Sequence, residues 1–292
     1  MELKYAIDEF IINRRVKGCS TETIKLYKDA LKRFINYMSE DISINCLTVR
    51  KLNDYYLYLS KFNISSSTIQ NRIRVLRSFL NWCFAEDYIK ERLTDRFRLP
   101  KAKRNVIDIL NQTEIQKLLE MFNQSNKTGL RNYCICMLML DCGLRLKEVV
   151  TLQVENIYIN EKYMIVDGKG NKQRIVPIGT IALESVKKYL SARGSASGTL
   201  FYSSRKLPLS TIAVSKLFHR LKKETKINRL KPHLLRHTFA TMYLENGGEI
   251  YSLQAILGHT SLEMVKRYLH LSKNKIVGNF HKFSPMDNIK YT

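Results

Sequence analysis

One stretch decides how this chain is interpreted: His233-Leu234-Leu235-Arg236-His237-Thr238-Phe239-Ala240-Thr241. It places two imidazoles and a guanidinium within little more than one turn of an otherwise mostly apolar helical segment. Downstream, Leu257-Gly258-His259 is followed by Tyr268, which adds another imidazole and a phenol. A phenolic nucleophile together with guanidinium and imidazole groups predicts a site that cleaves phosphodiester bonds.

The composition is typical of a soluble globular protein, with 45% hydrophobic and 26% charged residues, and a length of 292 residues suits two domains. No apolar run approaches the roughly 18 residues of a membrane span, and the N-terminus lacks the apolar region of a secretory signal. We therefore expect no membrane association and a cytoplasmic location. The six cysteines lack metal-type spacing, which favours reduced, buried thiols.

The charge balance indicates a polyanionic partner. The chain has 49 Lys and Arg residues against 26 Asp and Glu residues, a formal net charge of +23. Such an excess is the electrostatic footprint of nucleic-acid binding. A compositional drift toward Lys, Asn and Ile would raise the charge without any ligand, so charge alone leaves both interpretations open.

Residues 1–98 are predicted to form a helical bundle, because apolar residues recur at helical spacing without strand alternation. Ser20 precedes one amphipathic helix, and Ser67 with Gln70 forms an expected capping box for another. The buried stripe predicted for this second helix is Ile69, Ile73, Leu76, Leu80 and Phe84. Three arginines fall off the stripe and face either DNA phosphates or solvent: Arg72, Arg74 and Arg77.

The helical pattern stops near Pro100, where we place an interdomain linker over residues 99–106. Its basic residues are further candidates for DNA contacts: Lys101, Lys103 and Arg104. The second domain, residues 107–292, is expected to begin with a capping box of Thr113 and Gln116. Further helices are predicted over Asn132–Leu140 and from about Lys147.

A small antiparallel β-meander interrupts the helices of the second domain. Its hairpin strands are Tyr163–Val166 and Arg174–Pro177, with Lys169 at the tip of the turn. Lys172 and Arg174 are candidates for DNA contacts, with a solvated turn as the alternative. The glycines beside Lys169 do not match the spacing of a nucleotide-binding P-loop, so we expect no nucleotide cofactor.

The candidate site residues of the second domain, in their order along the chain, resemble the catalytic domain of the tyrosine recombinases, the phage-integrase and Xer-type family. The family's motif order is Arg, Lys on a hairpin, His-x-x-Arg, His and Tyr, and these positions are filled by Arg145, Lys169, His233, Arg236, His259 and Tyr268. The N-terminal region resembles the SAM-like core-binding domain of that family. The resemblance implies a mainly α, two-domain site-specific recombinase or integrase that needs no metal or other cofactor.

The resemblance also implies how this enzyme would work. It would cleave and rejoin double-stranded DNA at specific recombination sites through a covalent 3′-phosphotyrosyl intermediate. It would act as a homo-tetramer on DNA, and accessory recombination factors are possible further partners. Tyr268 would be the nucleophile, because a phenolic oxygen can attack a phosphodiester and conserve the bond. Arg145 and Arg236 would hold the non-bridging oxygens, since a planar guanidinium matches phosphate geometry. Glu148, one turn after Arg145, is expected to orient its guanidinium.

The remaining roles concern protons. Lys169 would protonate the departing 5′ oxygen, His233 would act as base or hydrogen-bond partner of the Tyr268 hydroxyl, and His259 would donate to the phosphate. A zinc site at His233 and His237 is the competing interpretation of the helical pair. It lacks the glutamate of H-E-x-x-H and an evident third ligand, so we expect no metal.

Plainer alternatives exist for each residue taken alone. Tyr268 lies beside apolar Leu262, Val265 and Leu269, as a core tyrosine would, and a lone arginine in so basic a chain is usually a solvated charge. Two other functions stay open: a type IB topoisomerase that relaxes supercoils without site preference, and a DNA-binding regulator without catalysis. Residues 271–292 are expected to form a tail that docks in a neighbouring subunit or frays.

Overall fold

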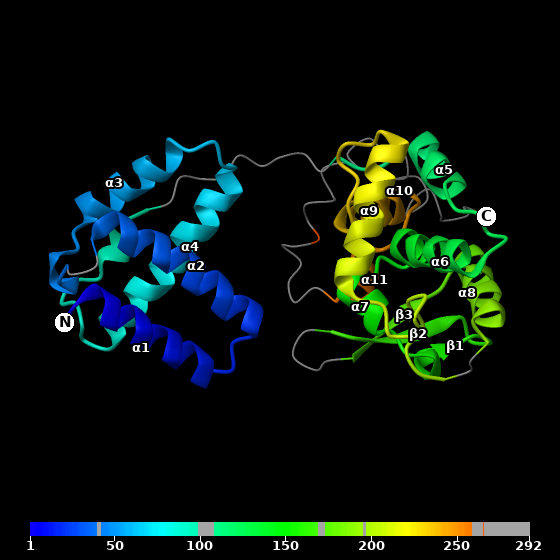
Figure 1. Ribbon diagram of the computed structural model, residues 1–292, viewed down its shortest axis with the longest axis horizontal. Helices are drawn as coiled ribbons and strands as arrows, with labels where there is room; N and C mark the ends of the chain where they lie inside the picture. Colours follow the sequence, from blue (N-terminus) through cyan, green and yellow to red (C-terminus); the bar gives the residue numbers. More distant parts are fainter. Residues whose placement is uncertain (40–41, 99–107, 169–172, 195–196, 259–264, 266–292) are drawn as a thin grey trace, which may run out of the picture. The chain divides into compact units, whose positions relative to one another are not determined.

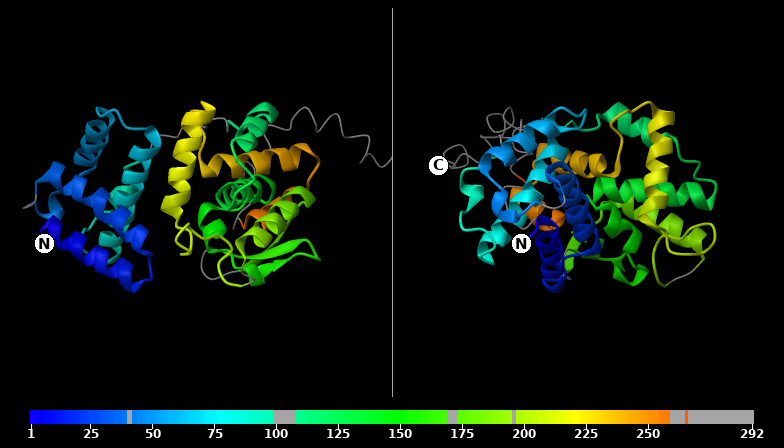
Figure 2. Two further views of the ribbon diagram at one scale, coloured as in Figure 1. Left: turned by 45° about the vertical axis from the view of Figure 1, so that its right-hand side comes forward. Right: turned by 60° about the vertical axis from the view of Figure 1, so that its left-hand side comes forward.

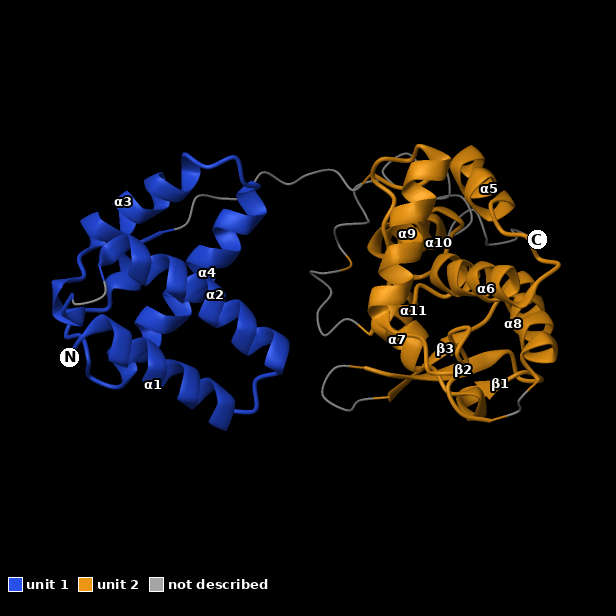
Figure 3. Ribbon diagram, viewed as in Figure 1, with its two compact units in different colours: residues 1–105 blue, residues 106–292 orange. Residues whose placement is uncertain are grey.

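The computed structural model describes residues 1–39, 42–98, 108–168, 173–194, 197–258 and 265. Contacts between Cα atoms divide the chain into two units, Met1–Asn105 and Val106–Thr292 (Figure 3). The linker expected over residues 99–106, with Lys101, Lys103 and Arg104, lies outside the described residues. Each unit has a hydrophobic core of its own.

The N-terminal unit is a bundle of helices, as predicted (Figure 1), and aromatic side chains meet in its core. Its elements are α1 (Leu3–Val16), α2 (Thr21–Met38), η1 (Ile44–Cys46), α3 (Val49–Ser60), α4 (Ser66–Ala85) and η2 (Leu93–Asp95). Helix α4 contacts the other three α-helices, and the ring centroid of Phe10 in α1 lies 5.5 Å from those of Phe79 and Trp82 in α4. Ser20 caps α2, as its position predicted: its side chain accepts a hydrogen bond from the backbone N–H of Thr23 at 3.3 Å.

Two expectations for α4 are wrong. The helix is capped by Ser65 rather than Ser67, because the Ser65 hydroxyl accepts the backbone N–H of Thr68 at 3.2 Å. At its other end Phe84 is 38% exposed, and Trp82 and the neighbouring Cys83 are buried instead. The last turn packs Trp82 onto α1, so the buried face there differs from the stripe that continues from the start of the helix.

The C-terminal unit places α6 in its interior, in contact with α8 and α10 (Figures 1 and 2). Its elements are α5 (Gln112–Glu120), α6 (Lys127–Asp141), α7 (Leu146–Thr151), η3 (Val154–Asn156), β1 (Ile157–Tyr158), β2 (Tyr163–Asp167), β3 (Gln173–Pro177), α8 (Thr180–Arg193), α9 (Thr211–Thr225), α10 (Pro232–Glu245) and α11 (Ile250–Leu257). Together with the N-terminal bundle, this confirms a mainly α fold with a small sheet.

The start of α5 differs from its prediction. Asn111 and Glu114 form its capping box, with the Asn111 side chain accepting the Glu114 N–H at 2.8 Å and the Glu114 carboxylate accepting the Asn111 N–H at 3.0 Å. The predicted box of Thr113 and Gln116 is therefore wrong. The preceding residue explains the choice, because the backbone N–H of Leu110 donates to the buried Thr238 hydroxyl of α10 at 3.0 Å and fixes where the helix enters.

The three strands form an antiparallel sheet in the order β1-β2-β3, which confirms the expected meander. The register pairs Met164 with Val176 and Val166 with Arg174. Directly opposed residues of an antiparallel pair point to the same face, so Arg174 shares the face of the buried Val166. Ile175, on the opposite face, is 62% exposed.

Four of the six cysteines follow the expectation of buried thiols, and Cys19 is half-buried. Cys83, Cys134, Cys136 and Cys142 are buried, whereas Cys46 is exposed in the η1 turn. In the part of the chain that is described, none of the helices combines the length and apolar character needed to cross a membrane.

Candidate active site

Five of the predicted site residues in the C-terminal unit are described by the structure: Arg145, Glu148, Arg174, His233 and Arg236. Arg145 is the N-cap residue of α7 and Glu148 lies in the first turn of that helix. Arg174 belongs to β3, and the remaining two to α10. Four other predicted residues lie outside the described ranges: Lys169, Lys172, His259 and Tyr268.

Glu148 is the centre of this cluster, with only 5% of its side chain exposed. Its Oε1 accepts hydrogen bonds from Arg145 Nη1 at 2.7 Å and Arg174 Nη1 at 2.9 Å. Its Oε2 accepts from Arg174 Nη2 at 2.9 Å and from the backbone N–H of Arg145 at 2.7 Å, and lies 3.8 Å from Arg236 Nη1. Burial alone would raise the pKa of Glu148, but Arg174 and then Arg145 outweigh it and hold the pKa below its ordinary value. Glu148 is therefore an anion.

The C-terminal end of α11 is the second acceptor of the same three arginines. Arg174 Nε donates to the carbonyl of Ile256 at 2.7 Å, Arg236 Nη2 to that of Leu257 at 2.6 Å, and Arg145 Nη2 to that of Gly258 at 3.4 Å. The last carbonyls of a helix have no donor within the helix and carry the negative end of its dipole. The guanidiniums thus complete the hydrogen bonding of α11 and fix the point from which the chain proceeds to His259.

Two glycines allow the backbone to come this close. Gly143 has φ +62° and lies against Phe239 and Leu257, where an added Cβ would be 2.4 Å from a ring carbon of Phe239. Its carbonyl accepts Arg236 Nη1 at 2.5 Å. Gly258 has φ +61°, and an added Cβ would lie 2.9 Å from Cδ of Arg174. Other residues are disfavoured at both positions by the backbone conformation and by the contact.

His233 lies in the first turn of α10, near the arginines. Partial burial of its ring, followed by the charges of Arg236, Lys231 and Arg145, lowers the pKa of His233 from its ordinary value of 6.5. The imidazole is therefore neutral at pH 7, the form that can accept a proton. Within the described residues no group of three metal-binding side chains is found, so His233 and His237 have no third ligand there.

The charges of the cluster suit a phosphodiester. Arg145, Arg174 and Arg236 against Glu148 leave a net charge of +2. A phosphodiester has one negative charge, and the attack of a phenolate adds a second in the transition state. Preorganised positive charge of this kind stabilises the transition state more than the ground state. Arg145, with 33% of its side chain exposed, is the guanidinium most open to a ligand.

Arg174 differs from its sequence interpretation as a DNA-binding or solvated cation. Only 11% of its side chain is exposed, and each of its three nitrogens donates within the protein. The sequence signal that could have revealed this is its alternation with Val176 in β3, which puts both side chains on the inward face.

The three arginines proposed in α4 also differ from one another. Arg77 is partly buried and donates through Nη1 to the carbonyls of Thr94 and Phe97, which ties η2 and the segment that follows it to α4. It is therefore chiefly structural. Arg74 is exposed and donates to the side chain of Asn71 at 3.2 Å, and Arg72 is partly exposed.

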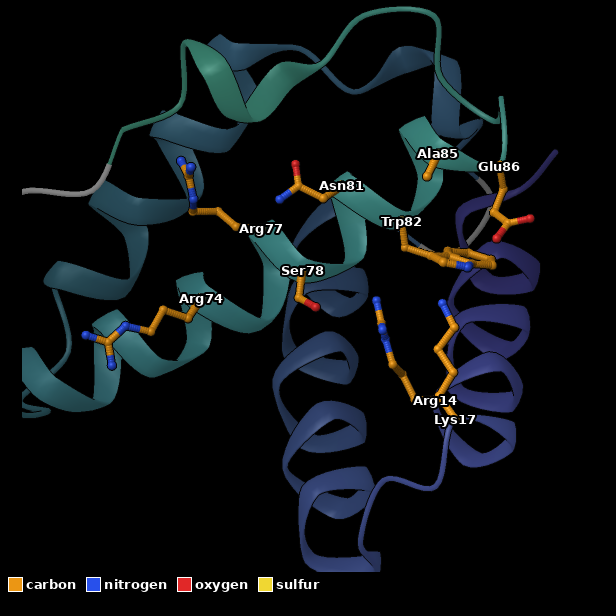
Figure 4. A pocket seen from close by; sticks show the side chains of 9 residues that line it. All are labelled: Arg14, Lys17, Arg74, Arg77, Ser78, Asn81, Trp82, Ala85 and Glu86. Atoms are coloured by element: carbon orange, nitrogen blue, oxygen red, sulfur yellow. The ribbon is translucent and has the colours of Figure 1, made fainter. Parts of the chain in front are cut away.

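A basic pocket of about 450 Å³ lies in the N-terminal unit, between the end of α1 and α4. Its lining includes two cations that the sequence interpretation missed, Arg14 and Lys17, which extend toward Trp82 and Ser78 (Figure 4). Among the described residues, the Nε of Arg14 and the indole Nε1 of Trp82 are buried without a hydrogen-bond partner. The positive charges of Arg14 and Lys17 on the pocket wall favour an anionic ligand.

Two family models match the chain. Residues 108–275 match the model of the phage integrase family, and residues 3–99 match that of the phage integrase SAM-like domain.

The chain is also similar to individual proteins. Tyrosine recombinase XerD of Staphylococcus saprophyticus subsp. saprophyticus is 31% identical over 278 residues, which cover 92% of this chain and 94% of the relative. The crystal structure of XerA recombinase matches with 26% identity and a TM-score of 0.53, over 99% of this chain and 100% of that one. XerH site-specific recombinase, in a post-cleavage complex with a palindromic difH substrate, has the same fold, with 22% identity, a TM-score of 0.75 and coverage of 92% and 82%.

Glu148→Gln should lower the free energy of unfolding by about 3–5 kcal/mol at pH 7, because it leaves the guanidiniums without their buried counter-charge. Glu120→Gln, at an exposed position of α5, is the control and should change it by less than about 0.5 kcal/mol. Urea unfolding measures both.

The pH dependence follows from the lowered pKa of Glu148. Its stabilisation is complete above the ordinary carboxyl pKa and is lost as the pH falls through the lower pKa of the folded state. The difference between wild type and Glu148→Gln should therefore shrink in acid. A difference that stays constant down to about pH 3 would contradict the ion-pair interpretation.

Lys17→Gln should weaken binding to a random-sequence duplex and reduce the slope of log affinity against log salt by about 0.9, the value for one lost phosphate contact. Glu86→Gln, in the same pocket, should strengthen binding, because it removes a repulsive charge. Both positions are exposed, so folding is not at issue. Fluorescence anisotropy at several salt concentrations gives the slopes; unchanged slopes in both variants would exclude the pocket from the DNA interface.

Proposed function

The chain belongs to the phage integrase family, and from this premise we propose a mechanism for it as a site-specific recombinase that cleaves and rejoins duplex DNA through a covalent 3′-phosphotyrosyl intermediate. The observation that carries the mechanism is the pair of guanidiniums, Arg145 and Arg236, which hydrogen-bond to the same helix end and lie against one buried carboxylate. Such a pair matches the two non-bridging oxygens of one phosphate.

In the proposed cleavage step, the phenolic oxygen of Tyr268 attacks the scissile phosphorus and the bond from phosphorus to the 5′ oxygen breaks. The phenol proton passes to His233, and the ammonium group of Lys169 gives a proton to the leaving 5′ oxygen. His259 donates a hydrogen bond to the phosphate. One phosphorus–oxygen bond forms for each that breaks, so no oxidant, reductant or nucleotide enters the balance, and rejoining is the reverse reaction.

DNA is the partner of this enzyme, and the charge of the chain agrees with contacts to many phosphates. In the proposed complex, the N-terminal unit binds the duplex through the pocket at Arg14 and Lys17 and through Arg72 and Arg74 of α4. The basic residues of the linker and Lys172 supply further phosphate contacts.

We propose further that four copies assemble on two recombination sites in the cytoplasm, with residues 271–292 as a tail that docks in a neighbouring subunit. Accessory factors would direct the reaction. A single active tyrosine cuts one strand, so exchange between two duplexes requires four strand cleavages, which a tetramer supplies.

The two competing functions have less support. A type IB topoisomerase would use similar chemistry without site preference, and a silent regulator would have no need of the arginine cluster. The relatives and solved structures described above are recombinases, and none of them favours either alternative.

Tyr268→Phe should bind DNA with unchanged affinity and form no covalent adduct, because it lacks only the nucleophilic oxygen. The wild-type adduct, trapped on genomic DNA fragments and sequenced, also identifies the target site. Denaturing electrophoresis of the protein with a nicked duplex that carries this site measures adduct formation. Persistent adduct in Tyr268→Phe would overturn the assignment of the nucleophile.

The cleavage rate should be level near neutral pH and fall as the pH decreases through the lowered pKa of His233, since only the neutral imidazole accepts a proton. His233→Gln should cleave about 10²–10⁴-fold more slowly and lose this acid limb. His219→Gln, at an exposed position of α9, should keep the wild-type profile. Single-turnover cleavage between about pH 5 and 8 tests this; the same acid limb in His233→Gln would assign it to another group.

A further inference from the structure

All three nitrogens of the Arg174 guanidinium donate hydrogen bonds to other groups of the protein. Its two terminal nitrogens form parallel hydrogen bonds of 2.9 Å to the two carboxylate oxygens of Glu148, and its Nε donates to the carbonyl of Ile256 at 2.7 Å. Such a bidentate pair fixes both the position and the rotation of the carboxylate. Arg174 is therefore placed to act on the arginine cluster without touching DNA.

The surroundings of Arg174 also hold its side chain in one place. Its partner in the register, Val166, is buried, and the sheet directs both side chains inward. On the other side the guanidinium packs against the backbone of Gly258, at a position where a Cβ would lie 3.1 Å from Nε. Strand β3, Glu148 of α7 and the end of α11 thus meet at this one side chain.

We propose that Arg174 is a positioning residue of the cleavage reaction: it locks Glu148 and the last turn of α11 in the arrangement that lets Arg145 and Arg236 grip one phosphate. This proposal rests on the recombinase mechanism given above.

Arg174 can have this effect because it determines which hydrogen bonds the two oxygens of Glu148 are free to accept. Because Arg174 holds both oxygens from one side, Oε1 presents its remaining acceptor capacity to Arg145, which reaches it at 2.7 Å with Nη1 alone. Nη2 of Arg145 makes only the long hydrogen bond of 3.4 Å to Gly258, so its second N–H and Nε are left for a ligand. Without Arg174 the carboxylate could rotate and take both terminal nitrogens of Arg145, and the carbonyl of Ile256 would lose its donor. The charge of the cluster would also fall by one.

The test compares Arg174→Met with wild type in single-turnover cleavage of two nicked duplexes that carry the trapped target site. One has the natural scissile phosphate. The other has a methylphosphonate there, in which a methyl group replaces one non-bridging oxygen and removes the charge. A neutral phosphorus centre depends less on two aligned guanidiniums, so a defect in their alignment should matter less on it.

We expect Arg174→Met to cleave the natural phosphate about 10²-fold more slowly at saturating DNA, the scale of losing one preorganised donor. On the methylphosphonate the deficit relative to wild type should shrink to less than about tenfold. DNA affinity should change by less than about threefold, because no phosphate contact is lost.

The matched control is Arg229→Met. Arg229 also forms a bidentate pair with a glutamate, donating to Glu114 at 2.7 and 2.6 Å, but it joins α5 to the segment before α10. It should cleave both substrates at rates within about threefold of wild type. Arg174→Lys, which keeps the charge but not the fork, should show a smaller deficit with the same dependence on substrate. It keeps the test decisive if circular dichroism shows Arg174→Met to be unfolded.

Four results would overturn the proposal. Affinity reduced tenfold or more, with a smaller salt slope and normal cleavage at saturation, would make Arg174 a DNA contact. Equal deficits on both substrates would indicate a merely structural role, and so would equal effects of the Arg174 and Arg229 variants. Absence of any deficit would exclude positioning. If instead the wild-type protein forms no adduct at all, the recombinase mechanism itself fails, and this outcome is distinct from the other four.

Discussion

The C-terminal unit depends on the balance between one buried carboxylate and three guanidiniums. Burying Arg174 and Arg236 is costly unless their charges are compensated, and Glu148 is the carboxylate within 4 Å of both in the described part of the chain. Its single negative charge cannot neutralise three cations, and the carbonyls at the end of α11 and of Gly143 accept further hydrogen bonds from them. The surplus positive charge suits the cluster to an anionic ligand, which a closed structural ion pair would not accept.

This balance also explains why distant parts of the chain meet where they do. Helix α7 brings Arg145 and Glu148, α10 brings Arg236 and His233, and β3 brings Arg174, while Gly143 and Gly258 let the backbone approach. The N-terminal unit has a separate basic pocket, which suits binding along a duplex rather than chemistry on it.

Much of this could be predicted from the sequence, and the misses have physical causes. The hairpin strands and the proximity of Arg145 to Glu148 follow from local spacing, and the structure has both. The starts of α4 and α5 were misplaced because several polar residues near each helix start can serve as the cap, and for α5 a distant contact, from Leu110 to Thr238, selects the entry. The sequence suggests a DNA-binding or solvated Arg174, because its partner Glu148 lies 26 residues away and no local pattern pairs them. The pocket at Arg14 and Trp82 likewise joins α1 to α4, two helices that lie far apart in the sequence.

The most direct measurement is a structure of the protein on its nicked target site with vanadate in place of the scissile phosphate. Vanadate adopts the five-coordinate geometry of the transition state. We expect the Tyr268 oxygen at one apex and equatorial oxygens within about 3.2 Å of both Arg145 and Arg236, with Glu148 and Arg174 still paired beneath them. A vanadate held by other groups, or a tyrosine other than Tyr268 at the apex, would contradict the mechanism.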